Sequence, residues 1–234
     1  MVDKRAGLKR TLRDLAELGE TAFSLLVPPL CLVCSTRLRS WERWVCGRCG
    51  LLISMGARPR DRVIRLGNGA SLSTRYGVEY TPEVSSVIRE MKYGGKPAVA
   101  EFIAGLLWPA ASDRLTGRAV LVPVPIHPAK KRERGYNQAE ILSRHLARFA
   151  GLSVAGDALA KRRNTPSQTT LEKDAREASV VGSIEARRVS DLRRRPVVLI
   201  DDVVTTGSTL RECARALNAQ GVEDISACAV ASSI

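Results

Sequence analysis

The stretch Val-Val-Leu-Ile-Asp-Asp-Val-Val-Thr-Thr-Gly-Ser-Thr occupies residues 197–209, and the rest of the chain is best interpreted outward from it. Its first four residues are apolar and three of them are β-branched, which predicts a short buried strand. Asp201 and Asp202 follow at the carboxyl end of that strand, where open α/β sheets bind their ligands. A turn of small residues comes next and leads into a helical pattern; it comprises Thr205, Thr206, Gly207, Ser208 and Thr209. The stretch therefore predicts a ligand site in an α/β fold.

The chemistry of this turn suits a phosphate group. Backbone N–H groups at a helix N-terminus and the helix dipole favour an anion, and Gly207 permits close approach of the ligand. Asp201 and Asp202 would repel a phosphate, but they can accept hydrogen bonds from hydroxyl groups or bind a metal. A ribose 5-phosphate unit has both parts, whereas the stretch lacks the Walker A and Gly-x-Gly-x-x-Gly patterns. An ordinary strand–turn–helix with two solvated aspartates is the alternative.

All thirteen positions resemble the phosphoribosyl-pyrophosphate (PRPP) motif of type I phosphoribosyltransferases. This resemblance implies that the protein binds PRPP together with Mg²⁺. It also implies that Asp201 and Asp202 are the catalytic residues, which orient the ribose, and that Thr205–Thr209 bind the 5-phosphate.

The 234-residue chain is strongly basic, with a formal net charge of +13 and a pI near 10.0. Residues 1–75 carry +8 (14 basic, 6 acidic) and residues 76–234 carry +5 (23 basic, 18 acidic). Such an excess of positive charge suggests that the protein contacts a polyanion or an anionic surface. The alternative is that it only increases solubility. The sequence shows no secretory signal, and Pro28 and Pro29 interrupt its longest apolar stretch, so no transmembrane segment is expected. We expect a cytoplasmic protein, with a peripheral position at the inner membrane face left open.

Four cysteines near the N-terminus form two Cys-x-x-Cys pairs separated by eleven residues, and they are Cys31, Cys34, Cys46 and Cys49. In a reducing compartment this pattern indicates a structural tetrahedral zinc site more than a redox dithiol, which is the alternative. Four thiolates leave no open position for catalysis. The remaining cysteines, Cys213 and Cys228, fall on apolar patterns and are expected in the core.

Two tryptophans, Trp41 and Trp44, lie beside arginines near the second cysteine pair. We interpret them as the small core of the cysteine module. Stacking of these aromatic rings on single-stranded bases is the alternative.

The chain divides into four predicted segments. Apolar residues recur at helical spacing in residues 1–26, which predicts an amphipathic N-terminal helix. Residues 27–55 hold a zinc-ribbon-like module with the four cysteines as its ligands. Glycines and prolines across residues 51–70 predict an irregular connection, of which residues 56–70 form the linker. Residues 71–234 form the phosphoribosyltransferase-like domain.

Strand and helix patterns alternate in this last segment, which predicts an α/β fold with a mostly parallel, covered sheet. Thr81 and Pro82 supply a helix N-cap and a first helical residue. The expected elements are a strand at 71–80, helices at 82–91 and 97–108, a strand at 119–126, a helix at 137–150 and strands at 197–200 and 225–231.

Two basic loops can neutralise a diphosphate, because arginine and lysine pair with its oxygens. Residues 126–137 contribute the candidates Lys130, Lys131, Arg132 and Arg134, and residues 161–176 contribute Arg162, Arg163 and Arg176. The second loop could also close over a ligand. A solvated basic loop is the alternative for each.

Several motifs together resemble the ComF/GntX family of competence-associated, type I phosphoribosyltransferase-like proteins. They are the cysteine pairs, Met91-Lys-Tyr-Gly-Gly-Lys96, Val122-Pro-Val-Pro125, Arg132-Glu-Arg-Gly-Tyr-Asn-Gln138, Thr165-Pro-Ser-Gln-Thr169 and the PRPP motif. The family commonly has Arg-x-x-Asn and Gly-Ala-Phe where this chain has Arg176-Glu-Ala-Ser179 and Gly182-Ser-Ile184.

The ComF/GntX resemblance implies PRPP and Mg²⁺ as ligands, structural zinc, and a role in competence and DNA uptake. Two functions remain open. The first is a phosphoribosyltransferase that releases pyrophosphate, with an unknown acceptor. The second is a PRPP-responsive accessory protein without turnover, whose basic zinc module contacts single-stranded DNA or the import machinery.

Overall fold

The computed structural model describes residues 29–67, 69–162 and 182–233. The chain separates into two compact units, residues 1–50 and residues 51–234. The expected amphipathic helix at 1–26 lies outside the described residues. Within the described ranges, no helix combines the length and the apolar character needed to cross a membrane.

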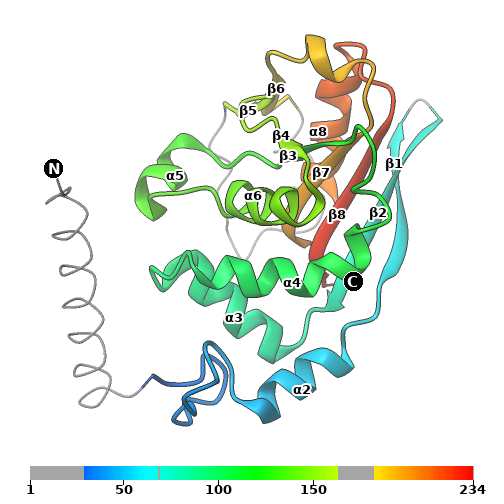
Figure 1. Ribbon diagram of the computed structural model, residues 1–234. Coiled ribbons are helices and arrows are strands. Elements are labelled where there is room, and N and C mark those ends of the chain that lie inside the picture. The colour runs from blue at the N-terminus through cyan, green and yellow to red at the C-terminus, as the bar shows by residue number, and fades with distance from the viewer. Residues whose placement is uncertain (1–28, 68, 163–181, 234) are drawn as a thin grey trace, which may run out of the picture. The chain divides into compact units, whose positions relative to one another are not determined.

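A six-stranded sheet forms the centre of the larger unit, with the strand order β1-β2-β8-β7-β3-β4 (Figure 1). Only the edge strand β1 runs antiparallel to its neighbour β2, and the other pairs are parallel. The predicted mostly parallel sheet is therefore confirmed. The strands are β1 (Arg60–Gly67), β2 (Ala70–Glu79), β3 (Val120–Pro123), β4 (Ser153–Val154), β7 (Val197–Val204) and β8 (Ile225–Ser232).

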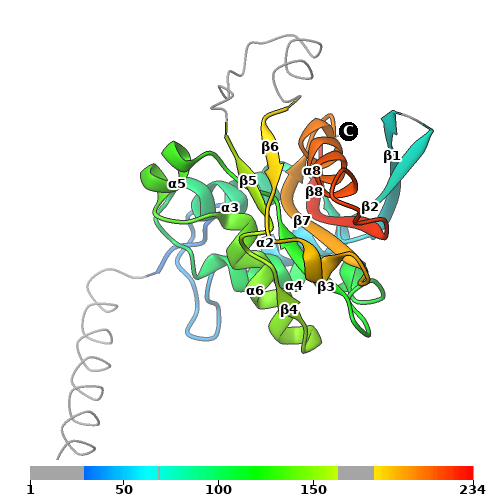
Figure 2. The same ribbon diagram turned by 90° about the horizontal axis from the view of Figure 1, so that it is seen from above.

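Helices cover both faces of this sheet. On one face α4 (Val99–Ala111) packs on β2 and β8, α6 (Gln138–Ala150) packs on β3 and β7, and α3 (Pro82–Tyr93) packs on α4. Figure 2 shows α8 (Ser208–Asn218) on the opposite side of the strands, where it contacts β1 and β6 (Ile184–Ala186). A separate antiparallel pair joins β6 to β5 (Leu159–Lys161).

The residues at the N-termini of α3 and α6 cap these helices as their sequence predicts. Thr81 accepts a hydrogen bond from the Val84 N–H and Pro82 begins α3, while Asn137 caps α6 in the same manner. Gly77 of β2 allows the closest approach between layers, because a Cβ there would lie 2.7 Å from the carbonyl oxygen of Leu106 in α4.

The hydrophobic core lies on both sides of β7. Val197, Val198, Leu199 and Ile200 are buried, as the opening stretch of the sequence predicts. Cys213 of α8 and Cys228 of β8 are fully buried too, which confirms that they are core residues.

Two predictions of irregular structure are wrong. Residues 51–70 include the end of α2 (Gly47–Met55) and all of β1, and Ile64 of β1 enters the core. The linker predicted at 56–70 is therefore largely a strand, which only its long-range pairing with β2 stabilises. Residues 126–137 are likewise not one open loop, since α5 (Pro128–Arg134) forms there with His127 as its N-cap.

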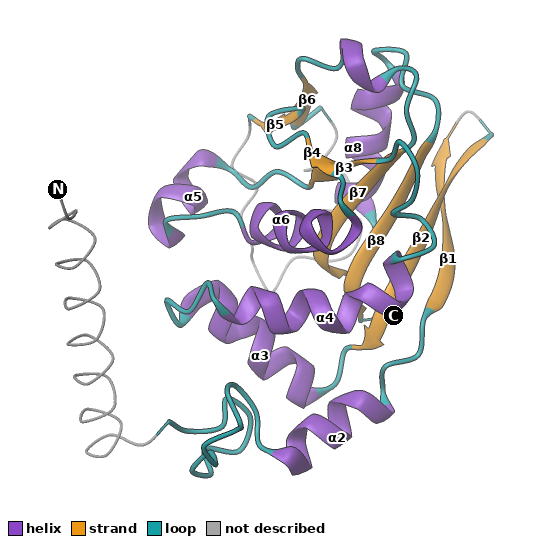
Figure 3. Cartoon of the chain, viewed as in Figure 1, coloured by secondary structure: helices purple, strands orange, loops and turns teal. Residues whose placement is uncertain are grey.

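The described part of the smaller unit consists mostly of loops and turns (Figure 3). Its small core contains Cys31, Leu38 and Cys49. The interpretation of Trp41 as a core residue is wrong, because its exposed fraction is 74% and the Arg39 guanidinium lies 5.4 Å from its ring centre. A unit this small has little interior, and the ring of Trp41 lies outside it.

Candidate functional site

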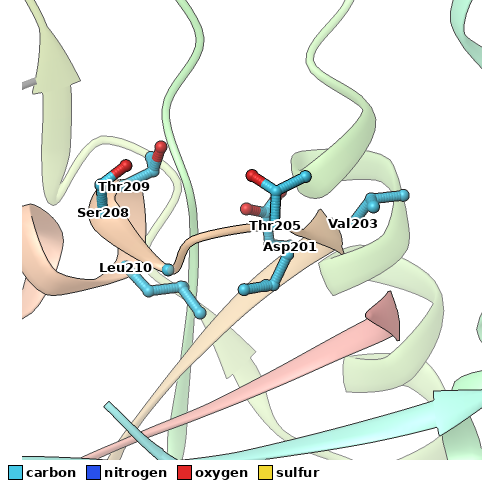
Figure 4. A pocket seen from close by; sticks show the side chains of 8 residues that line it. Asp201, Val203, Thr205, Ser208, Thr209 and Leu210 are labelled. Atoms are coloured by element: carbon cyan, nitrogen blue, oxygen red, sulfur yellow. The ribbon is translucent and has the colours of Figure 1, made fainter. Parts of the chain in front are cut away.

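The strand β7 ends at a shallow pocket formed by the turn that follows it. The backbone of Asp201 is in register with Ala229 of β8, and β3 ends one residue earlier on the other side of β7. The pocket is lined by Asp201, Val203, Val204, Thr205, Gly207, Ser208, Thr209 and Leu210. Figure 4 shows the hydroxyl oxygens of Thr205, Ser208 and Thr209 on one side of the turn.

The turn requires a glycine at position 207 for two reasons. Its φ of 79° is left-handed, a conformation that L side chains rarely adopt. A Cβ at this position would also lie 2.7 Å from Ile64 Cδ1 of β1. Within the turn, the Thr206 hydroxyl accepts from the Ser208 N–H at 3.3 Å and lies 3.0 Å from the Ser208 hydroxyl. The backbone is thus held in the shape that opens the N-terminus of α8 to a small anion.

The two adjacent aspartates have different surroundings. Asp202 has an exposed fraction of only 4%, and its Oδ2 lies 2.8 Å from Nζ of Lys92, the residue before the last of α3. Its other oxygen accepts from the Val203 N–H at 2.7 Å. Burial lowers the pKa of Lys92, but the charge of Asp202, its hydrogen bond and the charge of Asp201 together outweigh burial, and the net shift of that pKa is upward. Asp202 is therefore a fixed, ion-paired carboxylate.

Asp201 faces the ligand site more openly. Its Oδ1 accepts from the Asp202 N–H at 2.8 Å, and its side chain is half-buried. Burial and the neighbouring charge of Asp202 raise the pKa of Asp201 to about 7. A hydroxyl-bearing or cationic ligand would favour its ionised form.

A second groove opens on the other side of Asp201. It is lined by Val124, Pro125, Ile126, His127, Lys130, Lys161, Asp201, Asp202, Val203 and Thr209. Asp201 and Thr209 line both the groove and the pocket of the turn, so the two cavities adjoin. A ligand with an anion at each end and hydroxyl groups between them fits this order of side chains.

Positive charge is crowded at the far side of this groove. Burial, followed by the charge of Arg134, lowers the pKa of Lys130. Burial, followed by the charge of Lys130, lowers the pKa of Lys161. A bound polyanion would raise the pKa of both lysines, because its negative charge stabilises their two partly desolvated ammonium groups.

The structure separates the predicted loop cations. Lys130 lines the groove, whereas Lys131 pairs with Glu140 at 3.2 Å and Arg132 is exposed on α5. Arg134 lies over the ring of Tyr93, with the guanidinium carbon 4.7 Å from the ring centre.

Of the three arginines predicted from the second loop, only Arg162 is described, and it forms two 2.6 Å hydrogen bonds to Glu185. Arg163 and Arg176 lie outside the described residues. The roles of all these cations in diphosphate binding stay predictions.

Sequence reasoning missed two lysines that the fold brings to the aspartates, Lys92 and Lys161. Lys92 belongs to the Met91-Lys-Tyr-Gly-Gly-Lys96 motif, which contacts the Arg132–Gln138 motif through Tyr136, whose hydroxyl donates to the Met91 carbonyl. The glycine-rich end of the helical pattern at 82–91 was the available signal for Lys92. Nothing near Lys161 distinguishes it in the sequence.

The four cysteines of the smaller unit converge as predicted. Their Sγ atoms all lie within 4.8 Å of one another, and those of Cys34 and Cys46 are 3.7 Å apart. Four sulfurs bound to one Zn²⁺ at about 2.3 Å would be about 3.8 Å apart, so the cluster fits a tetrahedral zinc ion.

Comparison with known proteins agrees with this geometry. Residues 132–233 match the phosphoribosyl transferase domain family. Competence protein F of Haemophilus influenzae is 28% identical over 84% of this chain and 87% of its own length. Competence protein ComFC of Bacillus subtilis is 27% identical over 86% of this chain and 83% of its own length. The resemblance to the ComF family is confirmed.

A third relative is the DNA utilization protein YhgH of Escherichia coli, which is 27% identical over 82% of this chain and 85% of its own length. The matched domain at 132–233 contains the aspartate pair, the turn and α8. The type I phosphoribosyltransferase-like fold predicted from the ComF resemblance is therefore confirmed.

Proposed function

We propose that this protein binds PRPP with Mg²⁺ and transfers its phosphoribosyl group to an acceptor, with release of pyrophosphate. The observation that carries the proposal is the pair of adjoining cavities that share Asp201, one lined by the small-residue turn and the other by Lys130 and Lys161. The 5-phosphate would occupy the turn, the ribose hydroxyls would face Asp201, and the diphosphate would face the lysines.

In this transfer, a lone pair of the acceptor forms a bond to the anomeric carbon of the ribose. The carbon–oxygen bond to the diphosphate breaks, its electron pair leaves with pyrophosphate, and the acceptor loses a proton to water. Positive charge develops on the sugar, and the nearby carboxylates of Asp201 and Asp202 stabilise it. Lys130 and Lys161 stabilise the departing diphosphate electrostatically.

The oxygen-rich surroundings of Asp201 suit Mg²⁺, a hard cation that is held mainly by substrate oxygens, water and one or two carboxylates. When bound, it would add charge neutralisation at the diphosphate.

The names of the relatives support a setting in competence and DNA uptake, and we propose a cytoplasmic protein that acts there. The basic character of the first 75 residues, +8 from 14 basic and 6 acidic residues, is consistent with DNA or import machinery as a partner.

Calorimetry with PRPP and Mg²⁺ tests the proposal. The double variant Asp201→Ala, Asp202→Ala should lose measurable PRPP binding, because it removes the acceptors for the ribose hydroxyls. The matched control Asp191→Asn changes an exposed aspartate and should bind as the unmodified protein does. PRPP affinity that is unchanged in the double variant would overturn the proposal.

One observation favours the accessory function as a second candidate. Arg39 lies over exposed Trp41 and Arg43 lies over Trp44 at 5.2 Å, which offers rings and charge to single-stranded bases. Pyrophosphate release should be measured with PRPP, Mg²⁺ and either nucleobases or single-stranded DNA. PRPP binding without any release would favour the accessory function.

A further inference from the structure

A third cavity lies at the edge of the sheet, apart from the site around Asp201. It is lined by Arg58, Arg60, Asp61, Arg62, Tyr76, Val78, Glu79 and Ser232, which come from β1, β2, the end of β8 and the segment before β1. Its volume is about 150 Å³. A single water takes up about 30 Å³, and a cavity of about 150 Å³ in another protein holds benzene, so this space suits a small organic molecule.

Two buried polar groups belong to residues that line this cavity. The hydroxyl of Tyr76 and the Nη1 atom of Arg62 are buried and form no hydrogen bond within the described part of the chain. Tyr76 as a whole has an exposed fraction of 4%. Burial raises the pKa of Tyr76, while the positive charge of Arg62 and the polar side chains of Arg62 and Ser232 beside the hydroxyl oppose that shift. Buried polar groups of this kind normally bind something.

The cavity also carries unbalanced positive charge. Its two carboxylates are already engaged: Glu79 pairs with Arg60, and Asp61 binds the guanidinium groups of Arg75 and Arg114 at 2.9 Å. Arg58 and Arg62 form no salt bridge to a described carboxylate. An anion therefore balances the charge of this cavity better than a neutral molecule does.

Strand register places this cavity beside the proposed PRPP site. Tyr76 is paired with Ala229, and Ala229 with Asp201, so Tyr76 and Asp201 lie in one row on one face of the sheet. Two strand spacings separate them, about 10 Å. Three residues further along β8, Ser232 of this cavity is paired with Val204, which lines the pocket of the turn.

We propose that this cavity binds the acceptor of the phosphoribosyl group, and that the acceptor is a small organic anion with a carboxylate or phosphate beside an apolar body. The inference rests on the proposed function, which leaves the acceptor open. Arg62 and Arg58 bind the anionic group, the Tyr76 hydroxyl adds a hydrogen bond, and Val78 contacts the apolar body.

Saturation-transfer NMR with simple probes tests the binding chemistry. Benzoate and phenyl phosphate should both give signals with the unmodified protein, whereas the neutral benzamide should give little. Arg62→Gln should reduce the benzoate signal at least about fivefold, since a charge-assisted contact is lost. The matched control Arg65→Gln, at an exposed position on the opposite face of β1, should leave it unchanged. A response to phenyl phosphate alone would restrict the acceptor to phosphates and support the proposal in that form.

A second variant keeps the proposal testable if Arg62→Gln folds poorly. Tyr76→Phe removes only the hydroxyl and keeps the ring, so it should weaken benzoate binding without unfolding the protein. An absence of benzoate and phenyl phosphate signals with the unmodified protein, or equal signals with both arginine variants, would overturn the proposal.

Calorimetry with PRPP separates this result from the proposed function. Arg62→Gln should bind PRPP like the unmodified protein. An unmodified protein that binds PRPP but gives no anion signal would refute the acceptor cavity alone. Absent PRPP binding in the unmodified protein would refute the proposed function instead, and an anion site without PRPP binding would overturn its assignment to an acceptor.

Discussion

The turn after β7 and the cavity at the β1–β2 edge lie in one face of the same sheet, yet they are encoded in different ways. The groups that form the turn are contiguous, from Asp201 to Thr209. The cavity takes its groups from residues 58–62, 76–79 and 232, which meet only through strand pairing. The chemistry of a contiguous motif can be recognised in the sequence. Residues that only strand register brings together show no local sequence pattern.

The difference is not absolute, because the turn also depends on distant residues. The Asp202 carboxylate is buried against Lys92 of α3, and Gly207 packs against Ile64 of β1. Both contacts join the predicted motif to segments that carried no predicted site residue.

The largest effect is expected from Lys92→Met, which tests how far the turn depends on α3. It leaves the Asp202 carboxylate buried without its counter-charge, so the free energy of unfolding should fall by about 3–5 kcal/mol. The control Lys96→Met breaks a more exposed pair to Glu90 at 3.0 Å and should cost about 0–1 kcal/mol. Urea denaturation measures both, and equal losses would show that Asp202 does not need Lys92.

A smaller effect is expected from Gly207→Ala, which tests the contact between the turn and β1. The left-handed backbone alone should cost about 1–3 kcal/mol, and PRPP affinity should fall because the turn changes shape. Ile64→Ala removes a core side chain and is destabilising by itself, so the clash with Ile64 Cδ1 is measured as the coupling between Gly207→Ala and Ile64→Ala in a double-mutant cycle.

The control for this experiment is Gly105→Ala in α4, where a Cβ has open space and the protein should be slightly stabilised. Calorimetry and thermal melting follow both properties. A Gly207→Ala variant as stable and as active in binding as the Gly105→Ala variant would refute the structural need for glycine in the turn.

The smallest effect concerns pH and the half-buried Asp201. Its pKa is raised from 3.8 to about 7, so between these values the unfolded chain ionises while the folded protein keeps the proton. The contribution of Asp201 to the free energy of unfolding is complete below about pH 4 and is lost as the pH rises through about 7. Asp201→Asn should therefore gain at least about 1 kcal/mol relative to the unmodified protein at pH 8, and nothing at pH 4.

Urea unfolding at pH 4, 6 and 8 measures this difference, with Asp191→Asn as the control for an exposed aspartate. A difference that does not change with pH would show that Asp201 titrates normally in the folded protein.

Much of the fold was predictable because its signals are local. The apolar run at 197–200, the Thr81-Pro82 helix start and the cysteine spacing each specify structure within a few residues, and the structure contains the expected strand, helix and four-sulfur cluster. Residues 60–67 were not predictable as a strand, because charged side chains alternate there with few apolar ones and only β2 completes their hydrogen bonds.

The sequence by itself determined the α/β class, the aspartate pair with its phosphate-type turn, and the cysteine cluster, since each depends on neighbouring residues and their intrinsic geometry. The tertiary structure alone decided which cations reach the site. Lys92 and Lys161 lie beside the aspartates, Arg162 is bound to Glu185, and Arg62 lines the cavity at the sheet edge together with Tyr76. Long-range charge pairing depends on strand register and helix docking, and these follow from burial of the whole core.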